Sequence, residues 1–154
     1  MKKTIIIASL ITVLIMPFTI VQSQTNKNES NKEMVLKALK AVFIEGDTSA
    51  VDKYWAKDYI QHNPMFPNGS DIIKQFAKNK PQGFKFEPGL VMEDGEFVMV
   101  HSRYSGMNSK STIVVDILRV KNGKIVEHWD IIQDEVPASK SVNGNAMFPI
   151  EKSK

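Results

Sequence analysis

Asp116 is the residue of this chain best suited to acid–base chemistry, because it is a carboxylate within the largely apolar run 113–120. Charged side chains are rarely buried without a partner or a purpose. In an apolar cavity the charged form is disfavoured, so Asp116 can exchange protons near neutral pH. Two further titratable groups, His128 and Asp130, follow in the next predicted strand. We predict Asp116 and His128 as a catalytic pair with Asp130 beside it; the alternative is a purely structural Asp–His pair.

The turn between these two strands decides whether the three groups meet. If Asn122-Gly123 is a two-residue turn, Asp116 faces Trp129 and His128 points to the other side of the sheet. If the loop has three residues, with Gly123 in a bulge, Asp116 faces His128. Both loops are common in hairpins, so the pattern alone allows either.

Several other polar residues are candidates for the same pocket. His62 precedes Asn63-Pro64 in a loop, and loop-borne polar groups often serve sites, although a histidine there can also cap a backbone group. His101 and Arg103 alternate on one strand face, and Arg103 can hold a carboxylate or enolate oxygen or lie in solvent. No spaced ligand motif occurs, so we predict no metal.

Three helices are expected before the strands. Ser30 and Glu33 form a plausible capping box, and Gly46 ends the helix that follows. A second, short helix has an apolar face that ends at Trp55. A third starts near residue 70 and turns Phe76 inward. Trp55 and Phe76 are predicted as pocket walls, against the commoner role of such aromatic residues in a core.

The chain reads as strand from residue 84 onward. Four runs, each bounded by turn residues with Gly or Asn, fit an antiparallel meander. The runs are 84–92, 97–104, 112–120 and 125–133. Residues 59–62 also look extended, and the chain after residue 134 is rich in Pro, Ser and Asn without periodicity. Helices followed by a meander predict an α+β fold, with the sheet curled over the helices.

The N-terminus has the pattern of an export signal. A basic start is followed by the apolar run 4–21, and residues 21–23 suit a signal peptidase, so residues 1–23 are predicted to be cleaved. The alternative is an uncleaved membrane anchor. Cleavage removes 23 of 154 residues and leaves 131, and the formal charge falls from +3 to +1 with the loss of Lys2 and Lys3. With no cysteine and no basic–aromatic cluster, we expect a bacterial periplasmic or secreted protein that does not bind nucleic acid.

Three stretches carry a resemblance to a known family. These are Y59-I-Q-H-N-P64, the helix from Gly69 to Phe76, and the hairpin V-D-I-L-R-V-x-N-G-K-I-V-E-H-W-D ending at Asp130. Together they resemble the SnoaL-like polyketide cyclase group of the nuclear transport factor 2-like superfamily. The resemblance implies a cone-shaped curved antiparallel sheet on three N-terminal helices, enclosing an apolar pocket, with residues 24–30 a flexible leader, 31–134 the domain and 135–154 a tail. It also puts Asp116, His128, Asp130 and Ile132 inside the pocket, which favours the three-residue loop.

Comparison with ketosteroid isomerase, a relative of the same fold, argues against isomerase chemistry. The position of that enzyme's base is Asn63 here, and the position of its oxyanion tyrosine is Leu39. The position of a pocket tyrosine is Trp55, which can still wall the cavity.

Two functions remain open. The resemblance implies an enzyme, without a cofactor, that acts by acid–base chemistry next to a carbonyl, as in aldol condensation or cyclisation. Its ligand would be a small apolar or aromatic carbonyl compound. The alternative is a non-catalytic module of the same fold that binds a small molecule or dimerises through its sheet. The resemblance implies a homodimer in either case, with membrane contact only through an uncleaved N-terminal segment.

Overall fold

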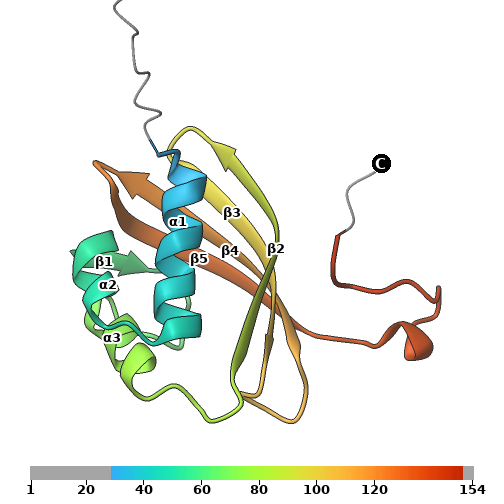
Figure 1. Cartoon of the computed structure of the whole chain (residues 1–154). Coiled ribbons are helices and arrows are strands. Elements are labelled where there is room, and N and C mark those ends of the chain that lie inside the picture. Colours follow the sequence, from blue (N-terminus) through green and yellow to red (C-terminus); the bar gives the residue numbers. More distant parts are fainter. Residues whose placement is uncertain (1–28, 151–154) are drawn as a thin grey trace, which may run out of the picture.

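The computed structural model of the chain describes residues 29–150 (Figure 1). The predicted signal peptide of residues 1–23, and the predicted leader up to residue 28, lie outside the described residues. Within residues 29–150, no helix combines the length and the apolar character needed to cross a membrane.

The first helix begins at the predicted capping box. Helix α1 spans Asn31–Leu39, and the Ser30 side chain accepts a hydrogen bond from the Glu33 backbone while the Glu33 carboxylate accepts one from the Ser30 backbone. The helix continues as the π-helical segment η1, Lys40–Glu45. Gly46 ends it with φ 74°, a left-handed conformation that glycine adopts without a steric cost, as the sequence predicts.

Two shorter helices and one strand complete the N-terminal half. Helix α2 spans Ser49–Tyr54, strand β1 spans Trp55–Gln61, and helix α3 spans Asp71–Lys78. Trp55 has extended backbone angles, φ −100° and ψ 146°, so it begins β1 and does not extend α2. The prediction that placed Trp55 on the helix is wrong, because the chain turns into the sheet one residue earlier.

Four long strands follow and form one curved, open sheet with β1. They are β2, Lys85–Asp94; β3, Phe97–Ser105; β4, Thr112–Lys121; and β5, Lys124–Asp134. The sheet order is β1-β5-β4-β3-β2. All neighbours are antiparallel except β1 and β5, which are parallel. This structure confirms the predicted α+β class with a curved sheet on three helices, and adds a parallel edge that the strand pattern did not reveal.

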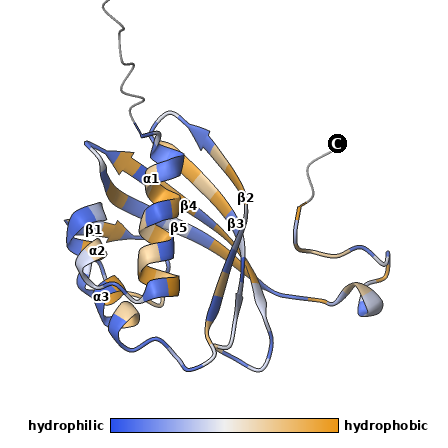
Figure 2. Cartoon of the chain, viewed as in Figure 1, coloured by the Kyte–Doolittle hydropathy of each residue, from blue (hydrophilic) through white to orange (hydrophobic). Residues whose placement is uncertain are grey.

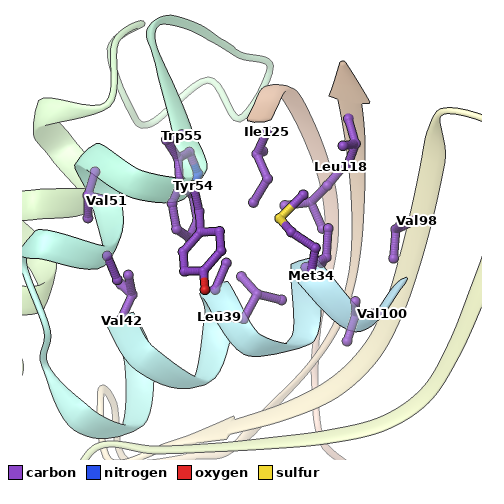
Figure 3. Packing of buried hydrophobic residues seen from close by; sticks show 14 of the residues in the cluster. Met34, Leu39, Val42, Val51, Tyr54, Trp55, Val98, Val100, Leu118 and Ile125 are labelled. Atoms are coloured by element: carbon purple, nitrogen blue, oxygen red, sulfur yellow. The ribbon is translucent and has the colours of Figure 1, made fainter. Parts of the chain in front are cut away.

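The core lies between α1 and one face of the sheet, here named the inner face. The apolar side of α1 faces the strands, and its polar side faces solvent (Figure 2). Val98 and Val100 of β3 and Leu118 of β4 belong to the same buried cluster as Met34 and Leu39 of α1 (Figure 3). Each fully buried side chain of this size contributes about 1.5–3 kcal/mol to folding. The core therefore fixes which face of β3, β4 and β5 turns inward.

Candidate active site

The hairpin between β4 and β5 has a two-residue turn. Asn122 and Gly123 both have positive φ, 51° and 71°, and Lys121 pairs with Lys124 directly across them. Positive φ at both central residues is the conformation of the tight turn that joins twisted strands. The three-residue loop with Gly123 in a bulge, which the resemblance favours, is therefore wrong.

A bulge next to the turn reverses the faces to which a two-residue turn alone would direct the later residues of β5. Val120 pairs with Ile125, but Arg119 pairs with Glu127, so Val126 is an extra residue on β5. A bulge of this kind shifts which side of the strand the following residues occupy. Beyond it, the residues of β5 point to the faces that the three-residue loop predicts. The expectation that a two-residue turn would abolish the Asp–His pair is wrong for this reason.

Asp116 is buried on the inner face and accepts hydrogen bonds from three side chains. It lies opposite Asp130 and diagonal to His128, and only 5% of its surface is exposed. Its Oδ1 lies 3.0 Å from Nε2 of His128. Its Oδ2 accepts from the hydroxyls of Tyr104 at 3.0 Å and Ser102 at 3.3 Å. The pair predicted from the sequence is present in the structure.

The hydrogen bond made by Nδ1 of His128 shows which protons the ring carries. Nδ1 lies 3.0 Å from Oε1 of Gln61, and the same oxygen accepts the backbone N–H of Asn63 at 2.9 Å. A backbone N–H can only donate, so this Gln61 atom is the oxygen and Nδ1 of His128 must carry a proton. The hydrogen bond between Nε2 and Asp116 then needs one more proton, shared between the two side chains.

Asp130 completes the polar cluster. Its Oδ2 accepts a 2.7 Å hydrogen bond from Nδ2 of Asn63. Asn63 is 6% exposed, and its Oδ1 accepts the backbone N–H of Met65 at 2.9 Å. Asn63 thus holds Asp130 in place.

Two tyrosines near the carboxylates stay protonated. Burial, reinforced by the charge of Asp116 and by its hydrogen bond, raises the pKa of Tyr104 well above its ordinary value. Burial, and then the charges of Asp116 and Asp130, raises the pKa of Tyr59. Both hydroxyls are therefore neutral near neutral pH. The hydroxyl of Tyr104 donates to Asp116, and that of Tyr59 accepts a hydrogen bond from Nε2 of Gln61 at 3.3 Å.

The cluster opens onto a cavity of about 510 Å³ between the sheet and the helices. A cavity of this volume accommodates a drug-sized molecule. Gln61, Tyr104, Asp116, His128 and Asp130 supply polar groups to its wall. The rest of the wall is mostly apolar, with contributions from Phe43, Phe66, Ile72, Ile73, Phe76, Met107, Val114 and Ile132.

The structure brings some of the predicted pocket residues to this cavity and not others. Asp130, Phe76 and Ile132 line it together with the Asp–His pair. Trp55 is buried in the hydrophobic core and is absent from the cavity lining (Figure 3). It begins β1 opposite Ile125 of β5 and belongs to the same buried cluster as Val51 of α2.

His62, His101 and Arg103 lie away from the cavity. His62 stacks on Trp129, with ring centroids 4.5 Å apart, and its Nε2 lies 2.8 Å from Glu127. His101 and Arg103 share the outer face of β3, opposite the core side chains Val98 and Val100. The alternation along β3 that groups them also directs both away from the pocket.

The C-terminal segment covers part of that outer face. Phe148 stacks on His101 at 5.7 Å, and the guanidinium of Arg103 lies 5.0 Å from its ring centroid. Arg103 also makes two 2.9 Å hydrogen bonds to Glu87. These bonds and the charge of Arg103 lower the pKa of Glu87. Arg103 is thus committed to a surface ion pair.

Among residues 29–150, one group of side chains could hold a metal ion: Asp116, His128 and Asp130. Each offers one ligand atom, and these atoms lie within 4.8 Å of one another. Divalent transition metals accept such a set of imidazole and carboxylate ligands. Nε2 of His128 and Oδ1 of Asp116, however, are engaged with each other. The geometry favours a hydrogen-bonded pair, and a metal-free site stays a prediction.

Sequence reasoning missed the residues that surround the catalytic candidates. Ser102 and Tyr104 alternate with His101 and Arg103 along β3 and lie on its inner face, and neither they nor Gln61 are among the predicted site residues. Both faces of β3 carry apolar residues near its start, so the pattern could not show which face turns inward. The signal for Gln61 is its position at the end of an extended run, which matters only once β1 pairs with β5.

Comparison with known families identifies the chain. A family model of the SnoaL-like polyketide cyclases matches residues 33–138, more than half of the chain. The chain belongs to the SnoaL-like polyketide cyclase family. The match begins within α1 and runs past β5, so it includes every residue that lines the cavity. A search of curated proteins finds no match.

Solved structures agree with a SnoaL-like fold. A protein of unknown function similar to nuclear transport factor 2, from Cytophaga hutchinsonii, has 18% identity and a TM-score of 0.60, over 70% of this chain and 94% of that one. Wild-type IdmH from Streptomyces antibioticus, a proposed polyketide cyclase, has 19% identity and a TM-score of 0.54, over 67% and 92%. A proposed ketosteroid isomerase from Kribbella flavida has 14% identity and a TM-score of 0.57, over 66% and 76%. At such identities the likeness concerns the fold.

Proposed function

We propose that this protein is an exported enzyme that uses Asp116 and His128 for general acid–base chemistry on a carbon next to a carbonyl. The reaction would be an aldol condensation or a related cyclisation of a small apolar or aromatic compound, without a cofactor. The observation that carries the proposal is the Asp116–His128 hydrogen bond, 3.0 Å long, in the wall of an open apolar cavity. Family membership supports a small-molecule cyclase or isomerase role at a coarser level.

The shared proton suits such a reaction. With the proton on His128, Asp116 is a carboxylate that can accept a proton from the carbon next to the ligand carbonyl. The C–H bond breaks, an O–H bond forms on Asp116, and the imidazolium balances the charge of the enolate. The enolate carbon then attacks a second carbonyl carbon, a C–C bond forms, and the new alkoxide takes the proton back from Asp116. Electrons and protons balance without an oxidant or a reductant.

The second candidate function is a binding module of the same fold. It is favoured by Asn63, which stands at the isomerase base position and uses its amide on Asp130 and on the backbone of Met65. Under this alternative the cavity captures a ligand without converting it. An open cavity supports ligand binding in both cases, but a buried pair that shares a proton favours chemistry.

Asp116→Asn tests the proposed function. Asparagine keeps the size of the side chain and can still accept hydrogen bonds from Tyr104 and Ser102, so the fold should survive. We expect the variant to lose about 10²–10⁴-fold in the rate of α-proton exchange of aromatic carbonyl compounds in heavy water, followed by proton NMR. Asp58→Asn, the same change at an exposed position, is the control. Unchanged exchange in the Asp116 variant would sink the assignment.

Export and self-association belong to the same proposal. The N-terminal pattern supports cleavage after residue 23, and N-terminal sequencing of the exported protein would test it. Exposed apolar side chains on the outer face, Phe97 and Ile131, support a homodimer through the sheet, which sedimentation of the mature chain would test. A monomer at micromolar concentration would count against the dimer.

A further inference from the structure

Five titratable side chains line the cavity: Tyr104, Lys110, Asp116, His128 and Asp130. The net charge of the wall depends on how each one is compensated. Tyr104 is neutral, since burial and the nearby Asp116 raise its pKa. Lys110 is exposed where the cavity meets solvent, and its Nζ lies 2.9 Å from Asp134, which compensates its charge.

The Asp116–His128 pair has no net charge. Gln61 holds one proton on Nδ1 of His128, and one proton lies between Nε2 and Oδ1 of Asp116. If that proton belongs to His128, an imidazolium faces a carboxylate. If it belongs to Asp116, a neutral imidazole faces a carboxylic acid. The charges of the pair sum to zero in both arrangements.

Asp130 is therefore the uncompensated charge of the cavity wall. Within the described part of the chain, the one hydrogen bond to its carboxylate comes from the neutral amide of Asn63, at 2.7 Å. Among residues 29–150, no lysine or arginine forms an ion pair with it. A carboxylate beside apolar walls gains from a cation or a strong donor that a ligand supplies, because the local dielectric constant is lower than that of water.

We propose that the cavity selects ring-bearing ligands that carry a protonated amine positioned against Asp130. The apolar side chains hold the ring, with Phe76 and Ile132 among them. The free oxygen of Asp130 accepts the ammonium group, and the same oxygen repels a ligand carboxylate. The inference rests on the proposed function in that both assign the ligand to this cavity, and it narrows the substrate class to amino-bearing carbonyl compounds.

Three probes share the indole ring system and differ in their head groups, and together they test the selection: tryptamine, tryptophol and indoleacetate. Calorimetric titration of the mature protein at neutral pH measures their affinities. We expect tryptamine to bind about tenfold or more tightly than indoleacetate, with tryptophol between them. This ratio in the unaltered protein is a test that needs no variant.

Asp130→Asn and Asp58→Asn form a matched pair for the same measurement. An asparagine at position 130 can still accept the hydrogen bond from Asn63, and we expect it to bring the affinities of the amine and the acid within about threefold of each other. Asp58→Asn removes one exposed charge that does not line the cavity and should leave the ratio unchanged.

The proposal is overturned if indoleacetate binds as tightly as tryptamine, if Asp130→Asn leaves the ratio unchanged, or if none of the three probes binds at millimolar concentration. These outcomes are separate from those of the activity test. A preference for tryptamine without any α-proton exchange supports the selection and contradicts the chemistry. α-Proton exchange without a preference for tryptamine supports the chemistry and contradicts the selection.

Discussion

Two histidine–carboxylate pairs lie on opposite faces of the same strand, and they differ in the exposure of the histidine and in the other partners of the carboxylate. Glu127 and His128 are neighbours on β5, yet Glu127 pairs with His62 on the outer face while His128 pairs with Asp116 on the inner face. The inner side chains are 12% and 7% exposed, against 41% for His62 and 13% for Glu127. The distances are similar, 3.0 Å and 2.8 Å.

The partners of each carboxylate explain what the difference means. Glu127 also binds Arg119 at 2.7 Å, so a permanent cation compensates its charge. Asp116 has no such cation and accepts from the two neutral hydroxyls of Ser102 and Tyr104. The outer pair is therefore part of a charge-compensated group on the outer face, beside Trp129. The inner pair has to share a proton to stay neutral, which is the property that acid–base chemistry requires.

Removing each carboxylate in turn should give the largest difference in stability between the two pairs. Asp116→Ala leaves His128, Tyr104 and Ser102 without their acceptor, and we expect the free energy of unfolding to fall by about 3–5 kcal/mol. Glu127→Ala removes the acceptor of Arg119 and His62, whose side chains are already 31% and 41% exposed to water, so the loss should be about 1 kcal/mol or less. Urea unfolding followed by circular dichroism measures both, and equal losses would contradict the distinction.

Tyr104→Phe tests the inner face with a smaller change. Loss of its hydrogen bond to Asp116 should lower the free energy of unfolding by about 1 kcal/mol at neutral pH. The pKa of Tyr104 is raised in the folded state, so its contribution is complete below about pH 10, the unfolded value, and is lost as the pH rises above it. The phenylalanine variant should therefore lose less stability than the wild type between neutral pH and about pH 11.

Urea midpoints measured across that pH range provide the test. The difference between wild type and Tyr104→Phe should narrow above about pH 10. A constant difference would mean that the buried hydroxyl ionises as readily in the folded protein as in the unfolded chain.

His62→Gln should give the smallest effect. His62 is partly exposed, and glutamine can keep one hydrogen bond to Glu127, so we expect a loss below about 1 kcal/mol, mainly from the stacking on Trp129. Added salt should not change the stability of the inner pair and should reduce any ionic part of the outer one. Unfolding at low and high ionic strength, compared with His128→Gln, measures this. A loss for His62→Gln as large as for His128→Gln would contradict the assignment of roles.

Much of the fold was predictable from local patterns. The Ser30–Glu33 capping box, the left-handed Gly46 and the four strands after residue 84 each depend on a few neighbouring residues. The placement of Asp116 on the same face as core residues follows from strand alternation with Leu118 and Val120. These features depend on short-range geometry, which the amino acids largely encode one segment at a time.

The outer-face residues show where local patterns fail. His101 and Arg103 alternate with Ser102 and Tyr104, and both pairs are polar, so alternation alone offers two equal choices. Contact between β3 and the helices selects the face, and Phe148, far along the chain, then covers His101. Neither contact has a signature in the neighbouring sequence.

Local patterns in the amino acids are enough to place a carboxylate and a histidine on two adjoining strands with an Asn-Gly turn between them. Whether the two side chains meet depends on contacts between distant parts of the chain. The turn has two residues, which would direct His128 outward, and the extra residue Val126 reverses that outcome. A bulge forms where the buried faces of both strands must match the same core, so its position depends on the packing of Ile125 in that core and on the pairing of β5 with β1. Such long-range packing is a property of the folded chain and is not encoded in the hairpin alone.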